Sequence, residues 1–157
     1  MDIFLESHVK ALLLLLKYKV EFVLIGGYAV IIYGYERGTS DMDLWINPTN
    51  ENKSKLILAL REQGVSEAGL SQLNSLDFMS DPKVFHIGEK PNKIDFLTKV
   101  QGLKFDEADK SKKLLPFKDF LLPVIQYDHL ILIKMIAGRP QDNADVDVLS
   151  KINRNKL

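Results

Sequence analysis

Short apolar segments separated by polar turns recur along the chain and predict a mixed β-sheet flanked by helices, an α/β (α+β) fold. Runs rich in β-branched and aromatic residues and bounded by turn residues are typical of strands. Four such runs predict strands over 22–26, 41–46, 84–88 and 94–99. A fifth run, 121–125, contains Pro123, which lacks a backbone donor and therefore favours an edge strand.

Apolar residues at helical spacing predict the flanking helices. The apolar run 11–16 predicts a mostly buried helix over 2–18, which is too short to span a bilayer and lacks the basic flank of a secretory signal. Capping and turn residues add further expectations. These are a helix from Tyr28 to Tyr33, a helix over 50–63 ended by Gly64, a short helix and loop over 65–83, a loop or short helix over 105–113, a helix capped by Asp128 and ended by Gly138, and a helix starting at Pro140.

Two aspartates lie inside the second predicted strand. Because side chains on a strand alternate between faces, Asp41, Asp43 and Trp45 share one face, and the apolar residues between them share the other. The two carboxylates are about 7 Å apart along the backbone, and they repel each other unless a cation lies between them. Carboxylate oxygens without sulfur or imidazole favour magnesium. The alternative is an exposed strand face that carries two solvated acids.

A pair of glycines, Gly26 and Gly27, ends the first predicted strand and precedes a predicted helix. Glycine allows a ligand to approach the backbone closely, and a helix N-terminus offers free N–H groups to a phosphate. The alternative is a plain tight turn.

The order of these features resembles the DNA polymerase β superfamily of nucleotidyltransferases, particularly its small bacterial and archaeal members. The pattern is an apolar strand, Gly-Gly, an intervening run, and Asp-apolar-Asp-apolar. The motif Gly-Gly-Tyr-Ala-Val, together with residues 37–41, resembles the corresponding motif of the abortive-infection-type toxin group and of related minimal transferases. It is also similar to the lincosamide antibiotic nucleotidyltransferases, which usually carry a histidine where this chain has Thr39 and Ser40. The resemblance implies a palm-like fold, and the length of 157 residues predicts one domain over 1–157.

The resemblance also implies a third carboxylate on a neighbouring strand, and Asp95 fits because it alternates with Ile94 and Phe96. Asp41, Asp43 and Asp95 are then the expected catalytic and metal-binding residues. They would hold two Mg²⁺ ions, or Mn²⁺, which stabilise charge during in-line displacement of pyrophosphate. The alternative for Asp95 is an ordinary exposed acid on an edge strand.

Several further residues are expected to contact the nucleotide. Lys134 is a lone cation in an apolar helix, so it would meet a phosphate or a catalytic aspartate, or else extend its amine to solvent. Asp142 and Asp145 share a helix face, and we interpret them as first-turn acids that complement the helix dipole rather than as a second metal site. The expected nucleotide contacts are Gly26, Gly27, Arg37, Thr39, Ser40, Lys134 and Arg139.

Composition limits the function classes. The chain has 21 basic and 21 acidic residues and no net charge, so no global basic field attracts nucleic acid. Cysteine is absent, and the three histidines lack the spacing of zinc ligands. An RNA would therefore need a local basic patch, and a cytoplasmic location is expected. Two clusters offer such a patch: Lys110, Lys112 and Lys113, or Lys151, Arg154 and Lys156.

These expectations lead to three hypotheses. The first is a metal-dependent nucleotidyltransferase that moves a nucleoside monophosphate from an NTP to a hydroxyl group on protein or RNA, within a toxin–antitoxin or phage-defence pair. The second is modification of a small molecule such as an antibiotic. The third is a non-catalytic nucleotide-binding module. A single domain leaves little room for acceptor recognition, so the acceptor is expected to be small, to bind across a homodimer, or to be a partner macromolecule such as a protein that brings its own surface. No membrane is expected to be involved.

Overall fold

A six-stranded mixed sheet with the order β3-β4-β2-β1-β6-β5 forms the centre of the computed structural model, which describes residues 3–39 and 41–156, with side chains up to residue 153. β1 runs antiparallel to β2 and parallel to β6, and β2 runs parallel to β4. The strands are β1 (Phe22–Ile25), β2 (Asp41–Ile46), β3 (Val84–Ile87), β4 (Lys93–Leu97), β5 (Lys113–Phe117) and β6 (Phe120–Val124).

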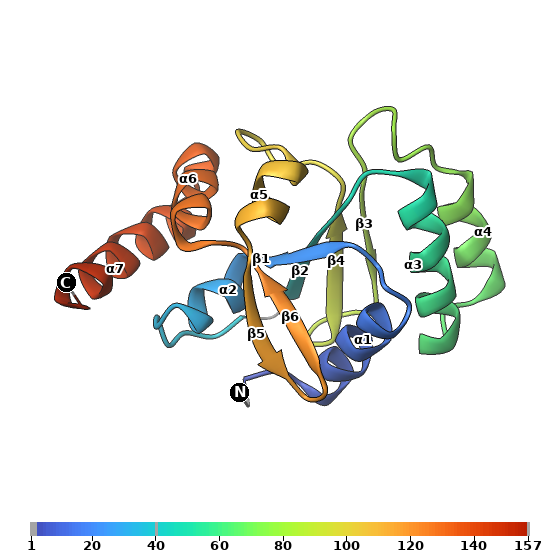
Figure 1. The fold of residues 1–157 in the computed structure, drawn as a ribbon, viewed down its shortest axis with the longest axis horizontal. Helices are drawn as coiled ribbons and strands as arrows, with labels where there is room; N and C mark the ends of the chain where they lie inside the picture. The colour runs from blue at the N-terminus through green and yellow to red at the C-terminus, as the bar shows by residue number, and fades with distance from the viewer. Residues whose placement is uncertain (1–2, 40, 157) are drawn as a thin grey trace.

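Helices flank this sheet, as the hydrophobic pattern predicts. Figure 1 shows α6 and α7 at one end of the molecule and α3 and α4 at the other, with the sheet between them. In the described part of the chain the helices are α1 (Glu6–Lys17), α2 (Gly26–Ile32), α3 (Asn50–Gln63), α4 (Glu67–Ser75), α5 (Phe105–Ser111), α6 (Tyr127–Ala137) and α7 (Pro140–Lys156). The expected mixed α/β fold is therefore confirmed.

The core is built from the apolar face of each strand. In β2, the side chains of Met42, Leu44 and Ile46 are fully buried, while Asp41 and Asp43 on the other face remain partly exposed. β4 follows the same rule with buried Ile94 and Phe96 on one face and partly exposed residues on the other. This alternation fixes the register, because a shift by one residue would bury the carboxylates and expose the apolar side chains.

The β5–β6 hairpin corrects one prediction. The segment 121–125 is not an edge strand: β6 lies between β1 and β5, and β5 forms the edge. Pro123 is tolerated there because β6 pairs with β1 at a single register position, Leu24 with Val124. The strand β5 was not predicted.

Helix starts differ from the predictions at three places. α1 begins at Glu6 rather than at residue 2, and α2 begins at Gly26, so both glycines belong to its first turn. Asp128 is not the N-cap of α6, because the Gln126 side chain accepts the hydrogen bond from the backbone N–H of His129. The expected end of α6 at Gly138 and the start of α7 at Pro140 are confirmed.

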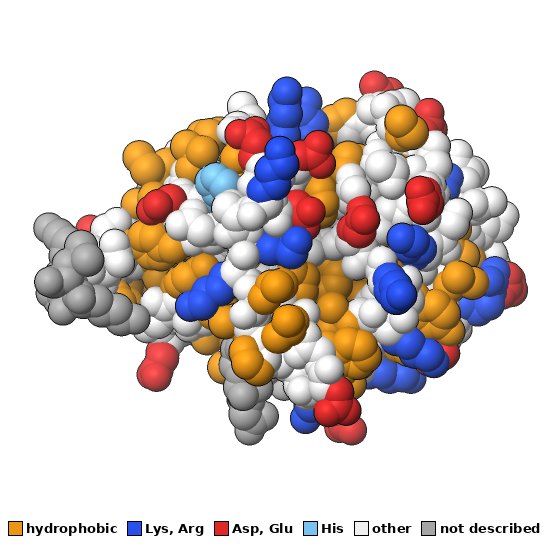
Figure 2. All heavy atoms as spheres, in the orientation of Figure 1, with side chains coloured by type: hydrophobic (Ala, Val, Ile, Leu, Met, Phe, Trp, Pro, Cys, Tyr) orange, Lys and Arg blue, Asp and Glu red, His pale blue; other side chains and the backbone are white. Residues whose placement is uncertain are grey.

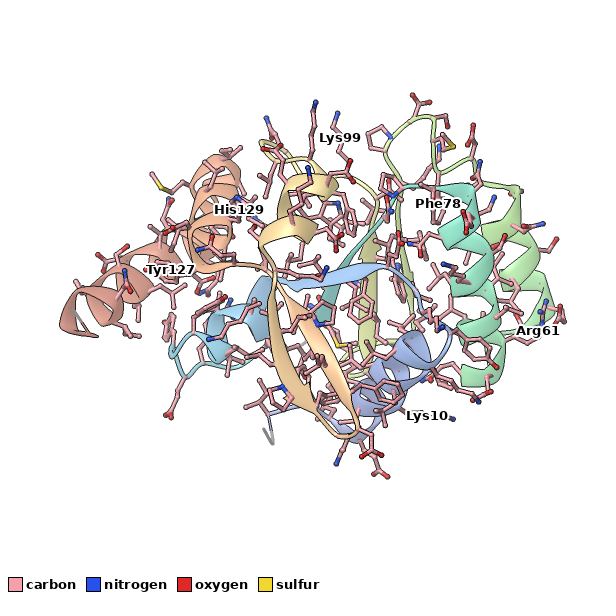
Figure 3. The ribbon with its side chains drawn as sticks, in the orientation of Figure 1. Lys10, Arg61, Phe78, Lys99, Tyr127 and His129 are labelled. Carbon is pink, nitrogen blue, oxygen red and sulfur yellow. The ribbon has the colours of Figure 1, made fainter. Side chains whose placement is uncertain are left out.

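A tyrosine joins the two C-terminal helices. The Tyr127 hydroxyl, labelled in Figure 3, donates a hydrogen bond of 3.0 Å to the carbonyl of Leu149 on α7. Its ring also meets the edge of Tyr33, just after α2, at 5.6 Å between centroids. These contacts tie α6, α7 and the end of α2 together.

The surface agrees with the neutral net charge. On the face drawn in Figure 2, acidic and basic side chains are interspersed, with no broad area of a single sign. None of the helices in the described residues has both the length and the apolar character needed to cross a membrane.

Candidate functional site

The parallel pairing of β2 with β4 brings the predicted carboxylates together. In this register Asp43 lies directly beside Asp95, and Asp41 lies beside Lys93. Neighbouring strands are about 4.8 Å apart, so Asp43 and Asp95 are close neighbours on the same sheet face. The neighbouring residues along each strand, Met42 and Leu44 on β2 and Ile94 and Phe96 on β4, are buried in the core on the opposite face of the sheet. The carboxylates are therefore on the face that is open to a pocket.

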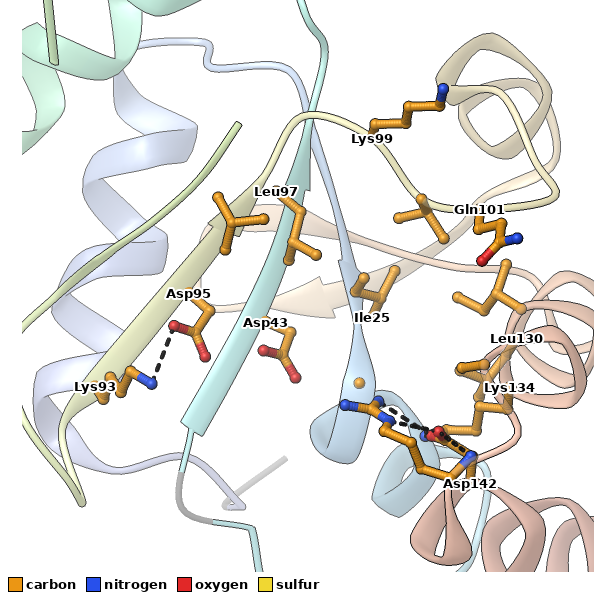
Figure 4. A pocket seen from close by; sticks show the side chains of 16 residues that line it. Ile25, Asp43, Lys93, Asp95, Leu97, Lys99, Gln101, Leu130, Lys134 and Asp142 are labelled. Atoms are coloured by element: carbon orange, nitrogen blue, oxygen red, sulfur yellow. Dashed lines mark hydrogen bonds and ion pairs between the residues drawn. The ribbon is translucent and has the colours of Figure 1, made fainter. Parts of the chain in front are cut away.

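A pocket of about 500 Å³ opens over this acidic face. Asp43, Lys93 and Asp95 line one wall, as Figure 4 shows, and the second wall comes from α6 and the start of α7 with Lys134 and Asp142. The volume lies within the range of small-molecule and cofactor sites. Of the predicted nucleotide contacts, the pocket includes Gly26, Lys134 and Arg139.

Asp43 is the most perturbed carboxylate of the site. The pKa of Asp43 is raised to about 6, mainly by burial and then by the neighbouring charges of Asp95 and Asp41, against the opposite influence of Lys134 and Arg139. A raised carboxyl pKa in a pocket is typical of functional sites. Burial is the main cause of the shift, and the two neighbouring carboxylates add to it.

Gly26 is required by the position of Asp43. A Cβ at Gly26 would lie 2.1 Å from Oδ2 of Asp43, and the residue has a φ of +71°. Both facts exclude other residues, since a positive φ strains an L side chain. The glycine therefore lets the first turn of α2 pack directly against the carboxylate.

Asp41 and Lys93 complete the acidic wall. Asp41 is not part of the pocket lining, but its Oδ2 is 4.0 Å from Nζ of Lys93, and that amine is 3.4 Å from Oδ1 of Asp95. The other carboxylate oxygen of Asp41, Oδ1, is buried and has no hydrogen-bond partner among the described residues. A buried acceptor without a donor is costly and is normally satisfied by a ligand, an ion or water.

The donor atoms of the three carboxylates can be compared with what a divalent cation requires. Among residues 3–39 and 41–156, no three His, Cys, Asp or Glu side chains are grouped as a finished metal site. The donors are nevertheless hard oxygens, and Oδ1 of Asp41 lacks a partner among the described residues. The pKa of Asp43 is raised by burial and also by the charges of Asp95 and Asp41. The residues present therefore fit a divalent cation.

The opposite wall contains a buried ion-pair cluster. Lys134 Nζ is 2.9 Å from Asp145 and 3.3 Å from Asp142, and all three side chains are almost completely buried. Arg139 contacts Asp142 at 2.7 Å, and Arg37 makes a two-point contact with Asp145 at 2.8 and 2.9 Å. Three cations and two carboxylates leave one net positive charge in this cluster.

This cluster corrects one interpretation and extends another. Lys134 does not extend to solvent, and its partners are Asp142 and Asp145 rather than a catalytic aspartate. Asp142 lies in the first turn of α7, as expected, and it and Asp145 are in addition buried ion-pair partners, which was not predicted. Burial alone would raise the pKa of Asp145, yet hydrogen bonds from Arg37, Lys134 and Gln141 outweigh it and hold that pKa below its usual value.

Three predicted nucleotide contacts lie outside the pocket lining: Gly27, Arg37 and Thr39. A Cβ at Gly27 would lie 2.5 Å from the Thr39 hydroxyl and 3.4 Å from Nη1 of Arg37, so both side chains cover the glycine. The Thr39 hydroxyl donates a hydrogen bond to the backbone carbonyl of Asp41 at 3.1 Å. These residues support the entry into β2, and Ser40 lies outside the described residues.

Sequence reasoning missed several residues near the site. Lys93 precedes Asp95 by two positions, so strand alternation alone would have placed it on the same face. His86 lies opposite Asp95 in the antiparallel β3–β4 pair, and paired residues share a face. Gln101 reaches the pocket from a loop, and no sequence pattern indicates its place.

Comparison with protein-family models and with curated proteins finds no match to this chain.

Proposed function

We propose that this protein is a metal-dependent nucleotidyltransferase that moves a nucleoside monophosphate from an NTP to a hydroxyl group on protein or RNA. The observation that carries the proposal is the register of β2 and β4, which sets Asp43 beside Asp95 on the wall of a nucleotide-sized pocket, with Asp41 next along the strand. The raised pKa of Asp43 supports it: burial is the largest cause, and the nearby charges of Asp95 and Asp41, which also raise it, are relieved by a divalent cation.

The residues divide into two groups around the pocket. Asp41, Asp43 and Asp95 would hold Mg²⁺, or Mn²⁺, which when bound neutralises phosphate charge and lowers the pKa of a coordinated hydroxyl. Lys134 and Arg139, on the facing wall, supply the residual positive charge that attracts the triphosphate. The guanidinium of Arg139 is the more available of the two, because 77% of its side chain is exposed.

The proposed reaction is an in-line displacement at the α-phosphorus of the NTP. The acceptor oxygen forms a bond to that phosphorus, and the bond from the phosphorus to the α,β-bridging oxygen breaks. Pyrophosphate leaves with the electron pair of the broken bond, and the hydroxyl proton passes to a carboxylate of the site. The two charged walls of the pocket position the triphosphate for this attack.

The acceptor class rests on the resemblance to abortive-infection-type toxins, which favours a protein or RNA acceptor within a toxin–antitoxin or phage-defence pair. A partner protein or a second copy of the chain would then supply part of the recognition surface. The cytoplasm, where NTPs and magnesium are available, is the proposed location, and the absence of cysteine agrees with it.

A small-molecule acceptor is the second candidate, and one observation favours it. A pocket of about 370 Å³, with aromatic walls formed by Trp45, Phe78 and Phe105, lies beside the first and shares Lys99 with it. A compact hydroxylated compound bound there would lie close to the acidic wall.

A labelling assay tests the proposal. Purified protein is incubated with magnesium, cell extract and each α-labelled nucleoside triphosphate in turn. We expect label on a protein or RNA band with the wild type and none with the Asp41→Asn/Asp43→Asn double variant. Asp119→Asn, an equal change on the exposed β5–β6 turn, is the matched control and should label as the wild type does.

The possible results separate the hypotheses. Full labelling by the double variant would exclude the carboxylate site as the catalytic centre. Label that appears only in a small-molecule fraction would favour the second candidate. Saturable nucleotide binding without transfer to any acceptor would instead identify a non-catalytic binding module.

A further inference from the structure

Lys93 is a cation that the fold builds into the carboxylate group. It lies on β4 two positions before Asp95, so the two side chains point to the same face of the sheet. The parallel register also sets it directly beside Asp41 on β2. Its position follows from the backbone pairing of two central strands, so the residue is held as firmly as the carboxylates are.

The Lys93 amine lies on one side of the acidic group. It is 3.4 Å from Asp95 and 4.0 Å from Asp41, and all three side chains are less than one-third exposed. Asp43 makes no ion pair within 4.0 Å among the described residues, and Figure 4 shows the Lys93 amine reaching Asp95 on the side away from α6. The Lys93 amine therefore occupies one of the two positions where a cation could bind, and the position beside Asp43 remains open to a metal ion.

Charge favours the same division. Three carboxylates and one ammonium sum to two negative charges, which one divalent cation neutralises. A second divalent ion shared by Asp41 and Asp95 would lie within a few ångströms of the ammonium, where like charges repel strongly in a partly buried site. One bound ion, rather than the two magnesium ions that the resemblance implies, is therefore favoured if the proposed transferase function holds.

We propose that Lys93 takes the place of the second metal ion, so that the site binds one divalent cation, held by Asp41 and Asp43. In this arrangement the Lys93 amine fixes the orientation of Asp95 and presents its positive charge to the pocket that it lines. A lysine is suited to this role because its ammonium is a compact point charge with three donors.

Electron paramagnetic resonance of Mn²⁺ tests the inference without measuring activity. Two metal ions of a catalytic pair lie about 3.5–4 Å apart, and Mn²⁺ ions this close give a spin-coupled spectrum that a single ion lacks. The protein is saturated with Mn²⁺ and a non-hydrolysable NTP analogue, and bound metal is counted by equilibrium dialysis. We expect an uncoupled spectrum from the wild type and Lys93→Arg, and a coupled pair from Lys93→Met.

Matched variants keep the test decisive. Lys99→Met removes an equal charge from the same pocket, but Lys99 is exposed and makes none of the ion pairs in the described residues, so its spectrum should match the wild type. Lys93→Gln replaces Lys93→Met if the latter fails to fold.

Three results would overturn the inference. A coupled pair in the wild type would show that two ions bind beside Lys93, and it would leave the transferase proposal standing. A single uncoupled ion in Lys93→Met would show that the lysine does not exclude the second ion. No Mn²⁺ bound to the wild-type protein would overturn both the inference and the proposed function, because the carboxylate group would not be a metal site.

Discussion

At the scale of one residue, the ionised Asp43 carboxylate lowers the stability of the folded protein. Its pKa in the folded protein is about 6, compared with 3.8 for an ordinary aspartate, because burial and two neighbouring carboxylates disfavour its charged form. Between about pH 4 and 6 the folded state therefore binds more protons than the unfolded state. The contribution of Asp43 to stability is greatest below this window and falls as the pH rises through it, so ionised Asp43 opposes folding at neutral pH.

Replacing Asp43 by Asn should therefore stabilise the metal-free protein. The shift of about two pKa units corresponds to roughly 3 kcal/mol at most, and we expect Asp43→Asn to raise the free energy of unfolding by roughly 1–3 kcal/mol at pH 7.5. The gain should be small at pH 4, where the wild-type carboxyl is largely protonated. Urea unfolding in EDTA at both pH values measures it, with Asp119→Asn as the control. A loss of stability at pH 7.5 would contradict this account.

The alternation of side chains is why residue-scale prediction succeeded in part. Asp43 and Asp95 could be assigned to one sheet face from a two-residue period, and the structure pairs them. The partners of Lys134 could not be predicted, because Asp142 and Asp145 reach it only through the turn between α6 and α7. The contact from Arg37 to Asp145 spans 108 positions along the chain, which no local pattern encodes.

At the scale of elements, the amount of apolar surface that a strand buries explains which strands could be predicted and why β5 could not. β1, β2 and β4 contain buried apolar side chains, and β3 contributes the partly buried Phe85 and Ile87, so the positions of these strands follow from their apolar residues. β5 has largely exposed side chains, and its sequence contains no β-branched residue and is interrupted by Pro116, so no strand was predicted there. Its pairing with β6 stabilises it instead, which is a property of the hairpin rather than of either segment.

The ion-pair cluster is the element-scale joint between α6 and α7. Replacing Lys134 by Met would leave Asp142 and Asp145 buried with fewer partners, and breaking a buried charge pair is costly. We expect Lys134→Met to lower the free energy of unfolding by about 3 kcal/mol, as measured by urea denaturation at pH 7.5. The control is Lys151→Met, which breaks an exposed ion pair with Asp147 on the same helix and should change stability little.

If Lys134→Met and Lys151→Met both changed the free energy of unfolding only slightly, the ion-pair cluster would not be needed to hold α6 against α7. In that case Lys134 would be retained for its place in the pocket wall rather than for stability. Its effect on nucleotide affinity, measured by titration calorimetry with the folded variant, would then exceed its effect on unfolding.

At the scale of the whole molecule, the pocket lies between the central sheet and the α6–α7 unit, so a ligand that contacts both walls joins two parts of the fold. A ligand that binds only the folded state stabilises it by about 2.7 kcal/mol at a concentration of 100 Kd. For a domain of this size each kcal/mol shifts Tm by roughly 2–4 °C. Magnesium with NTP at such a concentration should therefore raise the Tm by about 5–10 °C.

Trp45 provides a second measurement of the same event. It is the only tryptophan in the chain, it is buried, and it follows Asp43 by two positions on β2. Binding at the acidic wall should therefore change its emission together with the Tm. The Asp41→Asn/Asp43→Asn variant should show neither response, while Asp119→Asn should show both. An equal rise in Tm for the double variant would mean that magnesium and nucleotide bind away from Asp41 and Asp43.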